Sequence, residues 1–166
     1  MKKQAPDAID LLDADHLAVH GLFQSWRELV RTAAPALQRR ALAEEICMEL
    51  TIHARLEEEL FYPAVREALD DEDLVDDTGD QHGTQRELVA QILASSPDDQ
   101  SYDGKVAALE HYVEQHVRTE REQVFNRALA AKLDLQSLGR MIAVRKDELR
   151  AVSEALREDA LAPAFA

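Results

Sequence analysis

A histidine and a glutamate four residues apart recur along this chain of 166 residues, each time preceded by a lone histidine. The two repeats of this pattern comprise His16, His53, Glu57, His82, His116 and Glu120. On an α-helix, residues four apart differ in direction by only about 40°, so the histidine and glutamate of each repeat share a face. Imidazole and carboxylate groups together are typical ligands of iron, manganese or zinc. The pattern therefore indicates a metal site.

Helices must position these side chains, and the surrounding apolar residues predict them. Around His16, for example, Leu12, Val19 and Phe23 recur at spacings of three and four, the period of an amphipathic helix. Similar stripes surround the other three histidines, the one around His82 being weaker. Glycine and proline are scarce, at 5 residues each. We therefore expect an all-α protein, an up-down-up-down four-helix bundle over about residues 8–130.

The chain after the bundle is predicted to form one additional C-terminal helix. Asp134 matches the preference for an N-cap, and the helix would run from about 135 to about 157, followed by a poorly ordered tail over 158–166. This helix would pack outside the bundle or mediate a homo-oligomer. The length predicts a single domain over residues 1–166. The acidic segment 70–80 is expected to be mostly a solvated connection.

The cost of burying charged groups explains why a metal would be needed. If the two helix pairs pack with pseudo-twofold symmetry, the six side chains converge in the core. A buried carboxylate without a partner costs several kcal/mol, and two carboxylates with four imidazoles are hard to satisfy mutually. Two divalent or trivalent cations would satisfy all of them. A lone buried histidine is more often a hydrogen-bonded core residue, but six such residues in register favour a metal.

Residues next to the six are expected to lie off the site. On an ideal helix Glu58 and Glu59 are rotated by about 140° and 120° from the preceding histidine, so both should face solvent. A rotation of about 140° also turns His111 away. Whether His20 or Tyr62 touches the site is left open by the sequence, with solvent-facing and surface positions preferred for them.

Composition excludes several classes of function. A net charge of −14 repels phosphate backbones, so nucleic acid is not an expected partner. No apolar run approaches the roughly 18 residues of a membrane span, and the start MKKQAPDAIDLL does not resemble a signal peptide. We therefore expect no membrane association and a cytoplasmic protein. Cys47 is the single cysteine, which excludes an intramolecular disulfide and a multi-thiolate metal site.

Four segments resemble the hemerythrin-like, or HHE cation-binding, family over roughly residues 8–130. They are DHLAVHGLF (15–23), HARLEEELFYP (53–63), DQHGTQREL (80–88) and HYVEQHVRTEREQVF (111–125). The resemblance implies a four-helix bundle that holds two non-heme iron ions, with manganese or zinc as alternatives. It also implies an oxo, hydroxo or water bridge and a small exogenous ligand. Position by position, it places His16 and His53 on one iron, His82 and His116 on the other, and Glu57 and Glu120 as bridges.

The match to the oxygen carriers of the family is incomplete. Those carriers have His-x-x-x-His on the third helix and His-x-x-x-x-Asp on the fourth, where this chain has Arg86 and Arg121 as the second residue. The chain therefore resembles the broader HHE branch. The rival ferritin-like architecture requires Glu-x-x-His, which is absent from the predicted helices.

The predicted function is a non-heme di-iron protein that binds dioxygen, peroxide or nitric oxide, or that responds to iron and oxygen level. The alternatives are a di-iron oxidoreductase with peroxidase- or oxidase-like activity, an iron store or buffer, and a structural bundle without metal. The sequence favours a metal- and ligand-binding protein over an enzyme. Open coordination positions would serve the first three functions equally.

Overall fold

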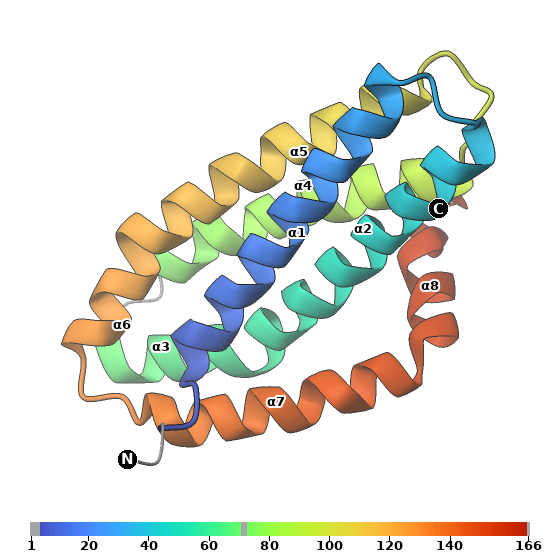
Figure 1. Cartoon of the computed structure of the whole chain (residues 1–166). Helices are drawn as coiled ribbons and strands as arrows, with labels where there is room; N and C mark the ends of the chain where they lie inside the picture. The colour runs from blue at the N-terminus through green and yellow to red at the C-terminus, as the bar shows by residue number, and fades with distance from the viewer. Residues whose placement is uncertain (1–3, 71–72, 166) are drawn as a thin grey trace.

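The structure of the chain is a computed structural model that describes residues 4–70 and 73–165, including the side chains of all of these except residues 73–81. Within the described residues the chain is helical apart from short connections and contains no strand (Figure 1). The predicted all-α class is confirmed. No helix in this part of the chain is long and apolar enough to cross a bilayer.

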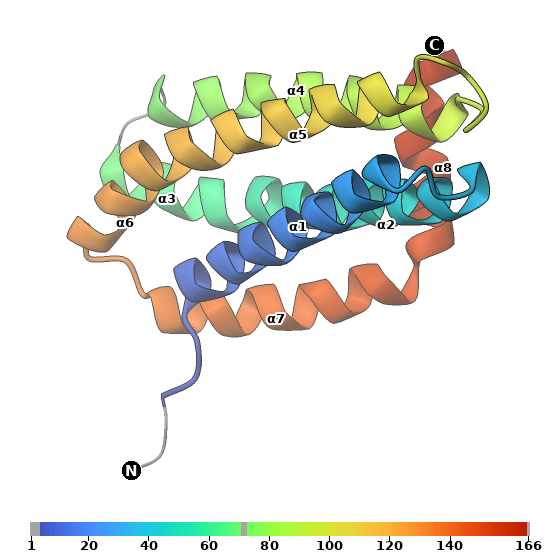
Figure 2. The ribbon, with the colours of Figure 1, turned by 45° about the horizontal axis from the view of Figure 1, so that its top comes forward.

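Four long helical rods lie alongside one another (Figures 1 and 2). Two rods are single helices and two continue through a π-helical turn. The first is α1 (Ala8–Arg31) and the third is α4 (Asp73–Ala94). The second consists of α2 (Ala36–Leu56), η1 (Glu57–Phe61) and α3 (Tyr62–Leu69). The fourth consists of α5 (Tyr102–Thr119), η2 (Glu120–Phe125) and α6 (Asn126–Ala130).

Short connections reverse the chain between α1 and α2 and between α4 and α5, and the two helices of each of these pairs pack against each other (Figure 1). Ala33, in the first connection, has a φ of 52°, and Asp70, after α3, has a φ of 50°. These left-handed residues stop the preceding helix. The expectation of a solvated connection over 70–80 was wrong in its extent, because the backbone is already helical from Asp73. The sequence also predicts Val75 and Thr78 in the apolar stripe around His82, and their side chains lie outside the described residues.

The start of the first rod shows how local sequence fixes a helix end. Asp7 and Asp10 form a capping box, in which each main-chain N–H donates to the carboxylate of the other residue at 3.0 and 2.9 Å. From there Leu12, His16 and Val19 turn one face of α1 into the interior. The capping box therefore fixes where α1 begins, and with it the position of His16 on the buried face of the helix.

The interior is divided into two apolar clusters. One cluster contains Leu12, Leu56 and Val124, and the other contains Val19 and Leu50 with the residues around them. In the first rod His16 lies between Leu12 of one cluster and Val19 of the other, and in the fourth rod His116 and Glu120 lie between Val113 and Val124. Cys47 is buried in the second cluster, and burial raises the pKa of its thiol to about 12.

The C-terminal segment differs from its prediction. Asp134 is the expected N-cap and accepts a hydrogen bond from the main chain of Ser137 at 2.9 Å. The single helix expected over 135–157 is instead two helices, α7 (Leu135–Ala151) and α8 (Ser153–Leu161), followed by the 3-10 turn η3 (Ala162–Phe165). Val152 leaves helical geometry at φ −115° and ψ 31°, and the resulting bend lets Leu156 pack into the core. The tail expected to be poorly ordered is thus mostly helical.

Candidate metal centre

All six predicted side chains come together in the interior. The four histidines are 1–7% exposed and both glutamates are 0% exposed. Their nitrogen and oxygen atoms form two overlapping groups, each within 4.8 Å, which share Glu57: His16, His53, Glu57 and Glu120, and Glu57, His82 and His116. Each of the four rods contributes at least one residue. The predicted convergence is therefore present.

The histidines meet in pairs through their Nε2 atoms. His16 Nε2 lies 3.1 Å from His53 Nε2, and His82 Nε2 lies 3.2 Å from His116 Nε2. If the Nδ1 atom of a neutral imidazole carries the proton, its Nε2 atom presents a lone pair. Two such lone pairs would face each other in each pair, and a cation bound to both would remove that repulsion.

Each buried glutamate reaches nitrogens of both histidine pairs. Glu57 Oε1 lies 2.8 Å from His53 Nε2 and 3.5 Å from His82 Nε2. Glu120 Oε1 lies 3.2 Å from His16 Nε2, and its Oε2 atom lies 3.4 Å from His116 Nε2. Despite this proximity, no described group hydrogen-bonds with good geometry to either oxygen of Glu57 or to Oε1 of Glu120. Buried carboxylate oxygens in this state need a cation or a proton.

The pKa values show how strongly the groups interact without a metal. Burial alone would lower the pKa of His116, but Glu120 and Glu57 outweigh it and raise this pKa to about 9. The pKa of His53 is likewise raised well above its usual value against the effect of burial, by Glu57 and Asp15. Burial would raise the pKa of Glu57, yet the neighbouring histidines hold it well below its usual value. The metal-free site therefore retains protons that a metal would displace.

Carboxylates outside the six hold the outer nitrogens of three histidines. Asp13 lies 3.3 Å from His16 Nδ1 and Asp15 lies 3.2 Å from His53 Nδ1. Glu58 lies 3.1 Å from the Nδ1 atom of the third of these histidines, His82. A carboxylate that accepts the Nδ1 proton fixes the ring and leaves Nε2 free to bind a metal. The expectation that Glu58 faces solvent was therefore wrong.

A cation from another part of the chain pairs with each of these carboxylates. The ion pairs are Arg121 with Asp13 at 2.7 Å, Arg86 with Glu58 at 2.8 Å, and Lys146 with Asp15. Neither the carboxylates nor the cations were among the predicted site residues. The spacing of the two aspartates, three and one residues before His16, was an available signal for them.

Tyr62 is a buried part of the site rather than a surface residue. Its side chain is 2% exposed, and its hydroxyl donates to Glu120 Oε2 at 2.5 Å. Burial and the two carboxylates, Glu57 and Glu120, raise the pKa of this hydroxyl well above its usual value. Tyr62 thus remains a donor and satisfies one of the four oxygens of the two buried glutamates.

Comparison with known proteins identifies this constellation. Residues 7–128 match the Hemerythrin HHE cation binding domain family. The chain belongs to this family. Its match covers all six converging residues and both π-helical turns.

Two similar proteins accompany the family match. A "DNA nickase" of Nostoc sp. is 32% identical over 123 residues, which are 74% of this chain but 34% of that protein. The chain therefore spans about a third of the length of this relative. The crystal structure of an HHE cation binding domain-containing protein from Mycobacterium kansasii covers 95% of this chain and 100% of its own, with 24% identity and a TM-score of 0.76. This structure shows that the chain has a hemerythrin-like fold.

A π-helical turn begins at each buried glutamate of the HHE site. Glu57 opens η1 and Glu120 opens η2. The wider π turn rotates less per residue than an α-helix, and such turns are frequent at functional sites. Pro63 follows η1, but η2 has no proline near it, so proline does not account for both turns. The turn η1 explains why Glu58 points elsewhere than an ideal α-helix predicts.

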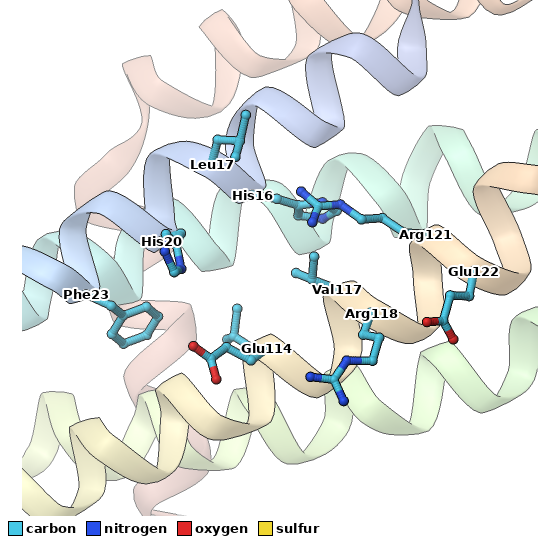
Figure 3. Close-up of a pocket in the computed structure, with 10 residues that line it drawn as sticks. His16, Leu17, His20, Phe23, Glu114, Val117, Arg118, Arg121 and Glu122 are labelled. Carbon is cyan, nitrogen blue, oxygen red and sulfur yellow. The ribbon is translucent and has the colours of Figure 1, made fainter.

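Two cavities border the HHE site. A cavity of about 10 Å³ in the interior touches three of the site histidines, His16, His53 and His116. A larger one of about 660 Å³ lies between α1 and the α5–η2 rod, where His16, His20 and Phe23 face Val117, Arg118 and Arg121 (Figure 3). Of the six site residues, His16 alone lines it.

His20 and His111 do not join the converging cluster. Both are exposed, and the described contact of His20 Nε2 is with the side-chain amide of Gln24 at 3.2 Å. His20 instead lines the larger cavity. The converging cluster therefore contains four of the six histidines, the same four that the sequence predicts.

The residues present fit a pair of metal ions. The donor set is four imidazole nitrogens and two carboxylates, a combination suited to iron, manganese or zinc. Three oxygens of the buried glutamates have no hydrogen-bond partner among the described residues, and the Nε2 atoms face one another in pairs. A metal at each pair would satisfy the groups that the protein leaves unsatisfied.

Proposed function

We propose that the chain holds two iron ions in a non-heme centre and binds a small exogenous ligand there, namely dioxygen, peroxide or nitric oxide. One ion would take His16 and His53, and the other would take His82 and His116. Glu57 and Glu120 would bridge the two ions. Bound iron would supply a redox-active ion with open coordination positions.

The observation that carries this proposal is the arrangement of paired Nε2 atoms around two carboxylates, three of whose four oxygens have no hydrogen-bond donor among the described residues. A core packed for stability alone would not bury two carboxylates at 0% exposure with three unsatisfied oxygens. The membership of the HHE family supports a cation as the missing partner.

The interior cavity supports a small ligand. Its volume of about 10 Å³ is roughly the space of one water molecule, so a larger molecule would require rearrangement. Valine and leucine side chains, Val19, Leu50 and Val113, line it together with the histidines. They exclude bulk water from the inner nitrogens. Tyr62 keeps its proton and orients the Glu120 carboxylate.

Metal content is the first test. The chain purified without added metal should contain about two iron ions, as in other two-metal sites. Addition of azide or nitric oxide should then change the absorption spectrum of the iron-loaded protein. Protein that takes up no iron when loaded with ferrous ions under anaerobic conditions would contradict the proposal.

A peroxide turnover assay separates the proposed function from its alternatives. A ligand-binding protein should bind with little turnover, whereas a peroxidase-like oxidoreductase should consume peroxide with a reducing co-substrate. A protein that accumulates iron without a spectral response to these ligands would be an iron store or buffer.

Chelation tests whether the ions stabilise the fold. A ligand at a thousandfold excess over Kd adds about 4 kcal/mol to the native state, which corresponds to on the order of 10 °C in Tm for a chain of this size. The loaded protein should therefore melt on the order of 10 °C above the chelated protein. An unchanged Tm, with loss of iron verified, would show that the metal-free core already satisfies its carboxylates.

The activity named for the Nostoc relative is not proposed for this chain. The chain spans 34% of that protein, and its net charge of −14 opposes contact with phosphate backbones. Nicking of supercoiled plasmid by the iron-loaded chain would overturn this part of the proposal.

A further inference from the structure

The C-terminal helix α7 lies outside the residues matched by the family but is fixed against the part that carries the site. It packs along α1 and α2, on the side away from α4 and α5 (Figure 2). Leu138, Ile142 and Leu149 form its buried face. Gly139 approaches the start of α1 so closely that an added Cβ would lie 2.8 Å from the main-chain carbon of Asp7. The position of α7 on α1 is thus closely defined.

Lys146 stands where this apolar stripe would place another apolar residue. It follows Ile142 by four residues and precedes Leu149 by three, the spacing of a core-facing position. Its side chain is 23% exposed and its ammonium pairs with Oδ1 of Asp15. The side chain of Asp15 is only 11% exposed, and its other oxygen lies 3.2 Å from His53 Nδ1. A continuous line of contacts therefore runs from α7 to the site.

We propose that Lys146 is a positioning residue for one of the two metal positions, because it holds the carboxylate of Asp15 that orients His53. This inference rests on the proposed function, in which His53 binds a metal. A carboxylate on the outer nitrogen of a metal-binding histidine fixes its ring orientation, and losing it typically costs 10- to 100-fold in metal affinity. Without Lys146, Asp15 loses the group that anchors its other oxygen, so the ring of His53 is held less firmly.

Arg145, the neighbour of Lys146, provides a matched control. It also pairs with a carboxylate of the bundle, with its Nε atom 2.7 Å from Glu59 Oε2. The described partners of Glu59 are Arg145 and Arg55, neither of which is a site histidine. Loss of Arg145 removes an ion pair that docks α7 but no contact to a site histidine.

The test is the rate at which iron leaves the protein. The wild-type chain, Lys146→Met, Lys146→Arg and Arg145→Met are loaded with ferrous ions under anaerobic conditions, and release to an excess of chelator is followed. Lys146→Met should release one of the two ions about tenfold faster, at the low end of the effect of such supports. Lys146→Arg should restore a rate close to wild type, and Arg145→Met should leave both phases unchanged.

Equal acceleration by Lys146→Met and Arg145→Met would show that both residues only dock the helix, and the inference would be wrong. It would also be wrong if Lys146→Met changed neither phase. The thermal unfolding of the metal-free variants is measured alongside, and both methionine variants should lose similar stability. Should Lys146→Met fail to fold, Lys146→Gln takes its place in the same comparison.

A double variant tests whether Lys146 acts through Asp15. If it does, Asp15→Asn combined with Lys146→Met should release iron at the rate of Asp15→Asn alone. A further acceleration in the double variant would mean that Lys146 acts by another route and would overturn the inference. A wild-type chain that holds no iron overturns the proposed function itself, whereas two retained ions with no effect of Lys146→Met overturn only this inference.

Discussion

The two histidine pairs have the same ligands but different supports. The sequence before His16 places aspartates at 13 and 15, whereas the equivalent positions before His82 are Gly79 and Gln81. The first pair consequently has both supporting carboxylates on α1. The second pair takes the support of His82 from Glu58 on η1. The repeat in the sequence therefore specifies the metal ligands and not the groups that hold them.

The position five residues after each His-x-x-x-Glu histidine shows how this difference arises. That residue is Glu58 after His53 and Arg121 after His116. Glu58 contacts the lone histidine of the other repeat directly. Arg121 has the opposite charge. It pairs with Asp13, and Asp13 in turn contacts His16, the lone histidine of the first repeat. One repeat thus uses a carboxylate and the other uses a cation with an additional carboxylate.

The largest expected effect comes from the residues that the two pairs share. Glu57 and Glu120 each reach nitrogens of both pairs, so Glu57→Gln should disturb both ions. We expect iron content to fall from about two per chain toward zero. His53→Ala should leave about one, because it belongs to a single pair. Bound iron is measured by elemental analysis.

The exposed residue His111 serves as the control for this prediction, and His111→Ala should keep the iron content of the wild type. If Glu57→Gln lost only one ion, the two pairs would be independent sites rather than one centre with shared bridges.

The supports should act on one pair each. Glu58→Gln removes the carboxylate from His82, and Asp13→Asn removes it from His16. Each change should weaken one ion by roughly 10- to 100-fold, and the two changes should accelerate different phases of iron release to a chelator. Glu59→Gln is the control, since Glu59 pairs with arginines. Acceleration of the same phase by both variants would contradict the assignment of separate supports.

The dependence on pH follows from protons held by the metal-free site. The pKa of His116 is about 9 in the fold, against about 6.5 in an unfolded chain, so its protonation stabilises the metal-free protein fully below pH 6.5. This contribution is lost as the pH rises through about 9. Iron uptake has the opposite trend, because binding displaces the proton. From pH 6.5 to 9 the Tm of the metal-free protein should fall while its iron affinity rises.

Calorimetry of the metal-free protein and iron titration, both across this range, check the pH prediction. His116→Gln should flatten both curves relative to wild type. An iron affinity independent of pH would show that the imidazoles are already unprotonated before iron binds.

The six converging residues could be predicted because the helical periodicity is visible in short stretches of the sequence. The free-energy cost of burying a carboxylate likewise depends only on the residue type and its burial. Sequence reasoning placed Glu58 toward solvent because it assumed an ideal α-helix of about 100° per residue. The π turn that begins at Glu57 rotates less per residue, and the Glu58 carboxylate contacts His82. Nothing in the spacing of apolar residues distinguishes such a turn. The surface position preferred for Tyr62 rested only on how common tyrosine is at bundle surfaces, and its side chain is buried.

Contacts from distant helices to the carboxylates that hold the site histidines were also not predicted from the sequence. Lys146 reaches Asp15 from far along the chain, and the contact depends on how α7 lies on α1. Its position within an apolar stripe was a sequence signal that could have marked it as inward-facing. The helix propensities of the residues around Val152 do not predict the bend there. The bend lets Leu156 pack in the core, which depends on the tertiary structure.

The smallest expected effect concerns Tyr62, which belongs to the second rod but acts on a glutamate of the fourth. Tyr62→Phe keeps the ring packed beside His82 and removes the hydroxyl that donates to Glu120. A hydrogen bond to a buried charged group contributes about 1.5–3 kcal/mol, so the metal-free protein should lose roughly that much stability in urea unfolding. In the iron-loaded protein the loss should be smaller, because a bound cation would also satisfy the carboxylate. An equal loss in both forms would show that Tyr62 stabilises the fold through its hydroxyl independently of metal at Glu120, and that the bridge on this side is not shared as proposed.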